Sequence, residues 1–179
     1  MLRGSASVTV AAMAAADSVT TRRLPLVLAV AAVVLVVDQA TKFWAEATLA
    51  GRAPVPVLGS FLRFQLVHNA GAAFTIGSGS TWIFTIVAAV AVMALLWFAA
   101  RPQPPGRAVA LALLLGGATT HLLDRLFRAP GFARGQVVDF IDYNGWFVGN
   151  VADIALVVGA GLVVVLGSAR RTAEPAGSA

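Results

Sequence analysis

The stretch LPLVLAVAAVVLVV at residues 24–37 decides the fold class of this chain. It contains no charged residue, and the first charge after it is that of Asp38. A helix that crosses a bilayer needs about 20 mostly apolar residues, so we extend this span from Leu24 to about Trp44. This segment alone predicts a membrane protein.

Three further segments have the same apolar character. They are Thr81–Ala100, Ala108 to about Leu123, and Val151 to about Gly167. Trp82 and Trp97 lie near the ends of the first of these, where aromatic residues anchor helices at the membrane surface. The last two segments are short for a hydrocarbon core of about 30 Å, so we expect flanking residues to lengthen both helices.

The composition agrees with a single membrane domain. The chain has 179 residues, of which 59% are hydrophobic and 12% are charged, about half the charged share of a typical soluble domain. We expect residues 22–169 to form a four-span domain, with disordered tails at 1–21 and 170–179. Arginines flank the spans on the side of the termini with almost no acid among them, so we expect both termini in the cytoplasm.

The segment from Ala53 to Asn69, between the first two spans, has the pattern of a β-strand. Apolar and polar residues alternate in LRFQL at 62–66. Gly59-Ser60 can turn a hairpin from Val55–Leu58 into this strand. The predicted fold is therefore an all-α membrane protein of four transmembrane helices, with a small extramembrane β-hairpin, or cradle, between helices 1 and 2.

Composition also excludes several kinds of function. The chain has no cysteine, which excludes disulfides, thiolate metal sites and cysteine nucleophiles. Its formal net charge is +5, but the basic residues flank hydrophobic spans, so we expect contact with membrane lipids and not with nucleic acid. No Gly-x-Ser-x-Gly or His-Glu-x-x-His motif is present, which argues against serine hydrolases and zinc proteases.

Four aspartates are predicted to meet at one membrane face, opposite the termini. Asp38 and Asp124 close the first and third spans, Asp153 opens the fourth, and Asp139 lies in the loop between the third and fourth. Carboxylates at membrane depth are costly and usually functional. Two facing carboxylates that share one proton can perform aspartyl proteolysis, because one takes a proton from water while the other polarises the scissile carbonyl. This chemistry needs neither metal nor cofactor.

Several of these acids also have a structural interpretation. Asp38 lies four residues before Lys42, which is the spacing of an ion pair on one helix face. Asp124 adjoins Arg125 at a helix end, where it can order the following loop. Asp142 is expected to be a solvated loop acid. Turn or cap roles are open for Asn69, Gly71 and Asn150.

The two histidines raise the alternative of a metal site. His121 and Asp124 share one helix face, and with His68 and Asp153 they could in principle bind zinc. Because the spacings of the two histidines are unrelated, we expect no metal. We interpret His121 as a hydrogen-bonding residue of the site and His68 as the end of a strand.

Four sequence blocks occur in order along the spans. They are DQATK at 38–42, HNAGAAF at 68–74, GGA at 116–118 leading to LLDR at 122–125 and VVDF at 137–140, and NVAD at 150–153. Any one block is a weak signal, but their order and their places relative to the spans are specific. Over about residues 24–168 the chain resembles the bacterial lipoprotein signal peptidases (signal peptidase II).

The resemblance implies an aspartic endopeptidase whose catalytic pair is Asp139 and Asp153, because these match the aspartates of the family's Val-x-Asp-Phe and Asn-x-Ala-Asp motifs. It implies that Asn69 and Arg125 contact the substrate. The expected set of supporting or substrate-binding residues is Asn69, Gly71, His121, Asp124, Arg125 and Asn150, and the expected structural pair is Asp38 and Lys42.

The resemblance also implies a substrate and a location. The substrate is a prolipoprotein with a diacylglyceryl-modified cysteine, cut just before that cysteine. The protein is expected to be a monomeric, multi-pass protein of the bacterial cell membrane, with its active site at the outer face. Its expected partners are lipid-modified prolipoproteins and membrane lipids, with no nucleic acid and no cofactor.

The chain departs from the family pattern in two places. Thr120-His121 stands where the family usually has Gly-Asn, and Gly149 stands where it usually has Phe. Both departures touch the site, so a diverged paralogue with altered substrate is one alternative. A proton-coupled carrier is another, because membrane carboxylates near a cation also form proton relays. A non-catalytic membrane scaffold is the third.

Overall fold

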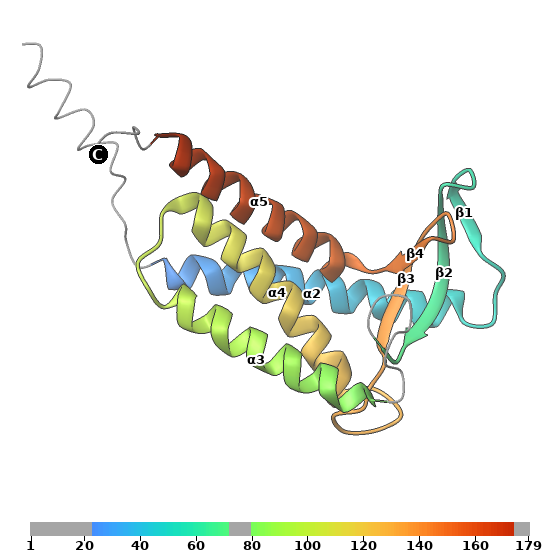
Figure 1. Ribbon diagram of the computed structural model, residues 1–179. Helices are drawn as coiled ribbons and strands as arrows, with labels where there is room; N and C mark the ends of the chain where they lie inside the picture. The colour runs from blue at the N-terminus through green and yellow to red at the C-terminus, as the bar shows by residue number, and fades with distance from the viewer. Residues whose placement is uncertain (1–22, 72–79, 174–179) are drawn as a thin grey trace, which may run out of the picture.

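The computed structural model describes residues 23–71 and 80–173. Four helices run alongside one another, with a β-sheet beyond one end of them (Figure 1). Each helix is long and apolar enough to cross a membrane, which confirms the four predicted spans. The helices are α2 (Leu24–Leu49), α3 (Thr81–Ala99), α4 (Pro105–Phe127) and α5 (Val151–Ala173).

The third and fourth spans gain the flanking residues that the membrane thickness requires. Helix α4 begins at Pro105, a residue suited to the first turn because its missing N–H would have no partner there. Helix α5 continues to Ala173, past the domain boundary expected at residue 169. The expected N-terminal tail at 1–21, residues 174–179 of the C-terminal tail, and residues 72–74 of the second sequence block lie outside the described residues.

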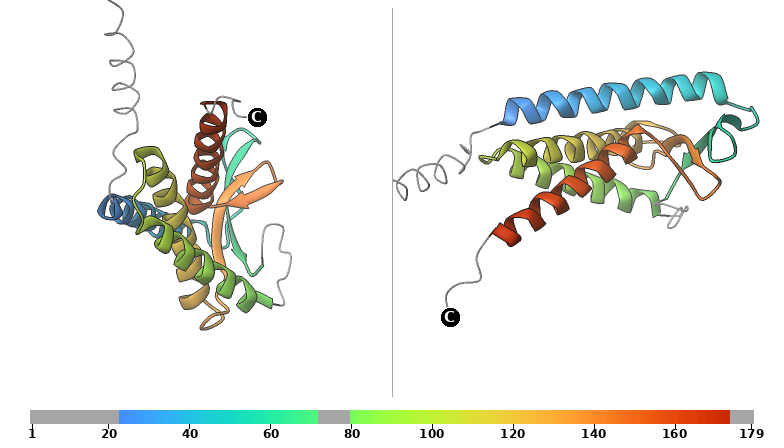
Figure 2. Two further views of the ribbon diagram at one scale, coloured as in Figure 1. Left: turned by 60° about the vertical axis from the view of Figure 1, so that its left-hand side comes forward. Right: turned by 90° about the horizontal axis from the view of Figure 1, so that it is seen from above.

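Helix α4 is the centre of the bundle and packs against the other three helices (Figure 2). Half of its most apolar window is buried, against 17% in each of the other spans. Two adjacent glycines permit this packing. A Cβ on Gly116 would lie 2.7 Å from Val34 of α2, and one on Gly117 would lie 2.9 Å from the carbonyl oxygen of Ala152 in α5. Small residues therefore bring α2 and α5 against α4.

The sheet has four antiparallel strands in the order β1-β2-β3-β4. Its first two strands are the predicted hairpin, but its last two come from the connection between the third and fourth spans, where no strand was predicted. The segment VVDFIDY is buried almost throughout and so lacks an alternating pattern. The strands are β1 (Val55–Leu58), β2 (Leu62–Asn69), β3 (Val137–Tyr143) and β4 (Phe147–Gly149).

An aromatic cluster fixes the sheet against the end of α2. The ring of Trp44 meets those of Phe64 and Phe140 edge-on, with centroids 5.3 and 6.1 Å apart. Ala45 and Leu49, on the same helix, belong to the same buried core. Strand β3 is thus packed against α2 and paired on both edges, which makes it a rigid support for side chains.

Asp142 on β3 is not the solvated acid that we expected. Its side chain is fully buried, and Arg63 of β2 donates from Nε to Oδ2 at 2.8 Å. The backbone N–H of Gly145 donates to Oδ1 at 2.6 Å. The prediction was wrong because the pairing of β2 with β3, which brings this arginine opposite the acid, could not be inferred from the local sequence.

Candidate active site

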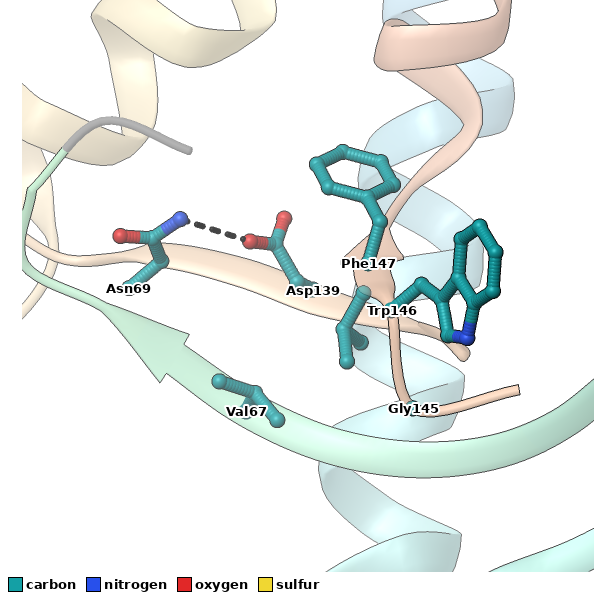
Figure 3. A pocket seen from close by; sticks show the side chains of 7 residues that line it. Val67, Asn69, Asp139, Gly145, Trp146 and Phe147 are labelled. Carbon is teal, nitrogen blue, oxygen red and sulfur yellow. Dashed lines mark hydrogen bonds between the residues drawn. The ribbon is translucent and has the colours of Figure 1, made fainter. Parts of the chain in front are cut away.

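Asp139 lies in the middle of β3, opposite Val67 of β2, and is 4% exposed. Two neutral amides bind its carboxylate. Asn69 donates from Nδ2 to Oδ2 at 3.1 Å, a contact drawn in Figure 3, and Asn150 donates from Nδ2 to Oδ1 at 2.7 Å. Strand β2 positions the first amide, and the junction of β4 with α5 positions the second. No cation bonds to this carboxylate among the described residues.

The orientation of both amides is fixed by the backbone. The Oδ1 atom of Asn69 accepts the N–H of Gly71 at 3.0 Å. The Oδ1 atom of Asn150 accepts the N–H of Asp153 at 3.1 Å. Since each amide oxygen is occupied by a backbone donor, each NH2 group must face Asp139. The turn and cap interpretations of the two asparagines are therefore right, and both residues also belong to the site.

Asp153 lies in the first turn of α5, where a helix favours negative charge. Its Oδ2 accepts the backbone N–H of Asn150 at 2.9 Å, which completes a reciprocal capping interaction with that residue. Its Oδ1 lies 3.2 Å from Nε2 of His121 on α4. The side chain is 26% exposed, so one side of this carboxylate stays open.

Burial and the charge of Asp153 raise the pKa of Asp139 to about 6. The hydrogen bonds from Asn69 and Asn150 and the charge of His121 act in the opposite direction and do not offset this rise. Two carboxyl groups that interact in this way share the first proton that they take up, so this proton belongs to the pair and not to one residue. The arrangement can therefore hold one ionised and one protonated carboxyl group near neutral pH, which is the requirement of aspartyl proteolysis.

Both carboxyl groups line one cavity of about 180 Å³, which has room for several water molecules. A second cavity, of about 170 Å³, adjoins it on the side of the turn between β3 and β4 and shares Asn69, Asp139 and Phe147 with the first (Figure 3). A wider apolar groove of about 450 Å³ begins at Asp153 and follows α5. The first cavity is lined by Asn69, Gly71, His121, Arg125, Val137, Asp139, Phe147 and Asp153.

Arg125 lines the first cavity but directs its donors to the backbone. Its guanidinium donates to the carbonyl oxygens of Ala70, Gly71 and Gly135. It also lies 5.2 Å from the ring centroid of Phe84. Arg125 thus holds the end of β2 against the segment that leads into β3, which keeps Asn69 beside Asp139.

Asp38, Lys42 and Asp124 form a second group of charges, which we name the lysine cluster. The Lys42 Nζ atom lies 2.7 Å from a carboxylate oxygen of each aspartate, and all three side chains are at most 1% exposed. This confirms the predicted pair of Asp38 with Lys42. Asp38 also accepts the N–H of Ala152 at 2.9 Å, and Asp124 accepts the N–H of Val138 at 3.4 Å. The cluster therefore binds the backbone next to each candidate catalytic aspartate.

Three residues that support the lysine cluster were not predicted. Gln39 and Arg128 donate to Oδ1 of Asp124 at 2.9 and 2.7 Å, and Arg128 also pairs with Glu46 at 2.7 Å. Arg128 lies four residues after Asp124, so the same spacing rule that paired Asp38 with Lys42 could have found it.

Phe147 was not predicted as a site residue either. It lines both cavities and the apolar groove.

The two histidines lie in different surroundings. His68 Nε2 is 3.6 Å from Glu46 and its side chain is 48% exposed, whereas His121 contacts Asp153 within the cavity. Across residues 23–71 and 80–173, no three His, Cys, Asp or Glu side chains are grouped as metal ligands. The geometry thus does not favour the zinc alternative.

The glycine at position 149 makes room beside Asp153. A Cβ at this position would lie 2.6 Å from the ring of Phe147 and 2.9 Å from Oδ2 of Asp153. The ring of Phe147 occupies the space that a side chain at position 149 would need. The two residues together therefore set the shape of the cavity wall.

Known proteins are similar to this chain in sequence. A family model described as signal peptidase (SPase) II matches residues 30–168. A lipoprotein signal peptidase of Mycobacterium avium is 48% identical over 145 residues, which are 81% of this chain and 80% of the relative. One from Bifidobacterium longum subsp. infantis is 46% identical over 144 residues, 80% of this chain and 78% of the relative.

Two solved structures have the same fold. Both are described as bacterial membrane enzymes studied by the in meso method. The first, at 2.3 Å resolution, has a TM-score of 0.74 and 28% identity and covers 87% of this chain and 94% of its own. The second, at 1.9 Å resolution, has a TM-score of 0.67 and 30% identity and covers 79% and 92%.

Proposed function

The chain belongs to the signal peptidase II family, and from that premise we propose that Asp139 and Asp153 are its catalytic pair. It is an aspartic endopeptidase of the membrane that removes signal peptides from prolipoproteins. The carrier and scaffold alternatives are therefore set aside. The observation that supports the pair most strongly is that both carboxyl groups line one cavity while burial and mutual charge raise the pKa of Asp139.

The proposed reaction uses a water molecule held between the two carboxyl groups. The ionised aspartate takes a proton from this water, whose oxygen forms a bond to the scissile carbonyl carbon. The protonated aspartate gives its proton to the carbonyl oxygen. When the tetrahedral diol collapses, the C–N bond breaks, the aspartate that took a proton from water gives it to the leaving nitrogen, and a diol hydroxyl gives its proton to the other aspartate. The pair then again holds one proton, and no acyl-enzyme forms.

The neighbours of the pair are proposed to act in two ways. Asn69 and Asn150 are occupied with Asp139, so we assign them to the orientation of this carboxyl group first and to substrate contact second. The apolar groove along α5 leads to Asp153 and is lined by Ile154, Val157 and Val158 among others. It fits an apolar part of the substrate that arrives through the lipid, next to a diacylglyceryl-modified cysteine.

Processing of a lipoprotein in a bacterial host without its own signal peptidase II tests the catalytic pair. Wild type, Asp139→Asn and Asp153→Asn are expressed at matched levels, and a gel follows the loss of the signal peptide from a diacylglyceryl-modified precursor. We expect cleavage by wild type and accumulation of precursor with both variants. Cleavage by either variant would remove that aspartate from the reaction. Failure of wild type on every precursor would favour a diverged paralogue with altered substrate.

The orientation in the membrane is also a proposal. The beginning of α2 and the end of α5 both lie at the end of the bundle opposite the sheet (Figure 1). Arginines flank the spans at that end. We propose cytoplasmic termini and an active site at the outer face of a bacterial cell membrane, in a monomer surrounded by lipid. Because the chain lacks cysteine, single cysteines at Gly131 and Arg101 can be compared with a membrane-impermeant thiol reagent. Labelling of intact cells at Arg101→Cys but not at Gly131→Cys would reverse the orientation.

A further inference from the structure

The two candidate catalytic aspartates have unlike partners. Asp139 is held by two amides, which cannot take up a charge. Asp153 lies 3.2 Å from the imidazole of His121, and an imidazole can become positively charged. The family resemblance led us to expect an asparagine at this position. An asparagine there could donate a hydrogen bond, but it could not neutralise Asp153.

We propose that His121 is a positioning residue that keeps Asp153 as the ionised, water-activating member of the pair, so that Asp139 holds the shared proton. This inference builds on the catalytic pair proposed above. It assigns the two aspartates unequal parts in the reaction, and it does so through the histidine in contact with one of them.

The preference of the proton for nitrogen supports this assignment. A free imidazole holds a proton about 2.6 pH units more tightly than a free aspartate. In this assignment Nε2 of His121 donates to Oδ1 of Asp153, which lies 3.2 Å away, since an ionised carboxylate can only accept a hydrogen bond. The first turn of α5 adds the N–H of Asn150 as a second donor to the same carboxylate.

The surroundings of Asp139 favour the protonated form instead. Its side chain is 4% exposed, against 26% for that of Asp153. Burial and the neighbouring charge raise the pKa of Asp139 to about 6. The more exposed carboxylate is thus the ionised one, and it is the one that water can reach more easily.

Other charges near His121 do not replace it. Arg125 lines the same cavity but donates to backbone carbonyls. Lys42 acts on Asp153 from α2 while its ammonium is bound between the two aspartates of the lysine cluster. His121 is the basic side chain in direct contact with Asp153 within the described residues. The titratable and charged groups around the contact are Asp139 and Tyr143 on β3, Arg125 on α4 and Lys42 on α2.

Infrared spectroscopy of the full chain in lipid nanodiscs, with labelled aspartate, tests which carboxyl group holds the proton. At about pH 5 to 6 we expect a protonated-carboxyl band in wild type that is lost in Asp139→Asn and retained in Asp153→Asn. Loss in Asp153→Asn with retention in Asp139→Asn would overturn the assignment. This measurement does not require cleavage, so its outcome is separate from that of the processing assay.

The pH dependence of cleavage tests the part played by His121. Glutamine can place an NH2 group where Nε2 lies but cannot be charged, so His121→Gln separates hydrogen bonding from charge. We expect the acid limb of kcat/KM to move to higher pH by about one unit in His121→Gln and in His121→Asn. His68→Asn, which removes the other histidine, should leave that limb unchanged.

An unchanged acid limb in His121→Gln would overturn the proposal, because the imidazole would then act only as a neutral donor. If a variant cleaves too slowly for a profile, the infrared titration of the same variant gives the answer. The midpoint at which Asp153 takes up a proton should rise by a similar amount. A midpoint equal to that of wild type would equally overturn the proposal.

Discussion

The lysine cluster and the proposed catalytic pair both place aspartates at the same end of the bundle, but the carboxyl groups have different partners in the two places. Asp38 and Asp124 share one buried ammonium, whereas Asp139 and Asp153 line one cavity and have two amides and one imidazole as their side-chain partners. A carboxylate with a fixed cation keeps its charge and serves as a support. A carboxylate without one competes with its neighbour for a proton. The partner of each aspartate therefore distinguishes a supporting carboxylate from one that we propose to be catalytic.

The largest expected effect comes from removing the cation of the lysine cluster. Lys42→Met leaves two buried carboxylates facing each other, and removing one partner of a buried ion pair costs about 3–5 kcal/mol. We expect the free energy of unfolding, measured by SDS titration in mixed micelles, to fall by about that amount. Cleavage should fall too, because the cluster binds the backbone beside both proposed catalytic aspartates.

A triple variant is the matched control for this prediction. Lys42→Met combined with Asp38→Asn and Asp124→Asn removes all three charges together, and replacing a whole buried ion group is often close to neutral. We expect most of the lost stability to return. A single Lys42→Met variant as stable as wild type would mean that the cluster is not a support.

The second prediction concerns the pH dependence of stability that Asp139 causes, because no cation pairs with its carboxyl group among the described residues. Its pKa is about 6 in the folded chain and about 3.9 in an unfolded one. Between these values the folded state binds more protons, so this group makes the protein less stable as pH rises from about 4 to 6, by on the order of 3 kcal/mol in total. Asp139→Asn should lack this loss, and the difference between the two unfolding curves isolates it. Parallel curves for the two proteins across this window would contradict the prediction.

Sequence reasoning located the acids better than it located their partners. Spacing within one helix paired Asp38 with Lys42, and the order of the blocks singled out Asp139 and Asp153. The cavity depends on the pairing of β2 with β3, which joins residues about 70 positions apart. No periodic pattern in the local sequence indicates this contact between β2 and β3. The four spans followed from hydropathy, but β3 and β4 did not, since a strand that is buried on both faces has no alternating pattern.

Asp142 provides a third case on the same strand as Asp139. It is fully buried like the acids of the lysine cluster and has its own cation, Arg63. We expect Arg63→Ala to lower the unfolding free energy by about 1–3 kcal/mol, because the buried carboxylate loses a charged partner. The pH profile of cleavage should stay as in wild type. Arg52→Ala, at an exposed arginine before the hairpin, is the control. A shifted pH profile in Arg63→Ala would show that Asp142 is coupled to the proposed catalytic pair.

The smallest expected effect is on kcat, when the room that Gly149 leaves beside Asp153 is filled. The fully buried acids of the lysine cluster have no such room. In Gly149→Ala the new Cβ meets Phe147 at 2.6 Å and Asp153 at 2.9 Å. One of the two side chains must move, and we expect kcat to fall about three- to tenfold, which corresponds to about 1 kcal/mol. Gly161→Ala is the matched control, because its Cβ would meet no atom within 4 Å. Adding Phe147→Leu removes the ring and should restore part of kcat if the ring is what displaces Asp153. A double variant no faster than Gly149→Ala would instead mean that the methyl group acts on Asp153 directly, and that the room beside this carboxylate depends on the glycine alone.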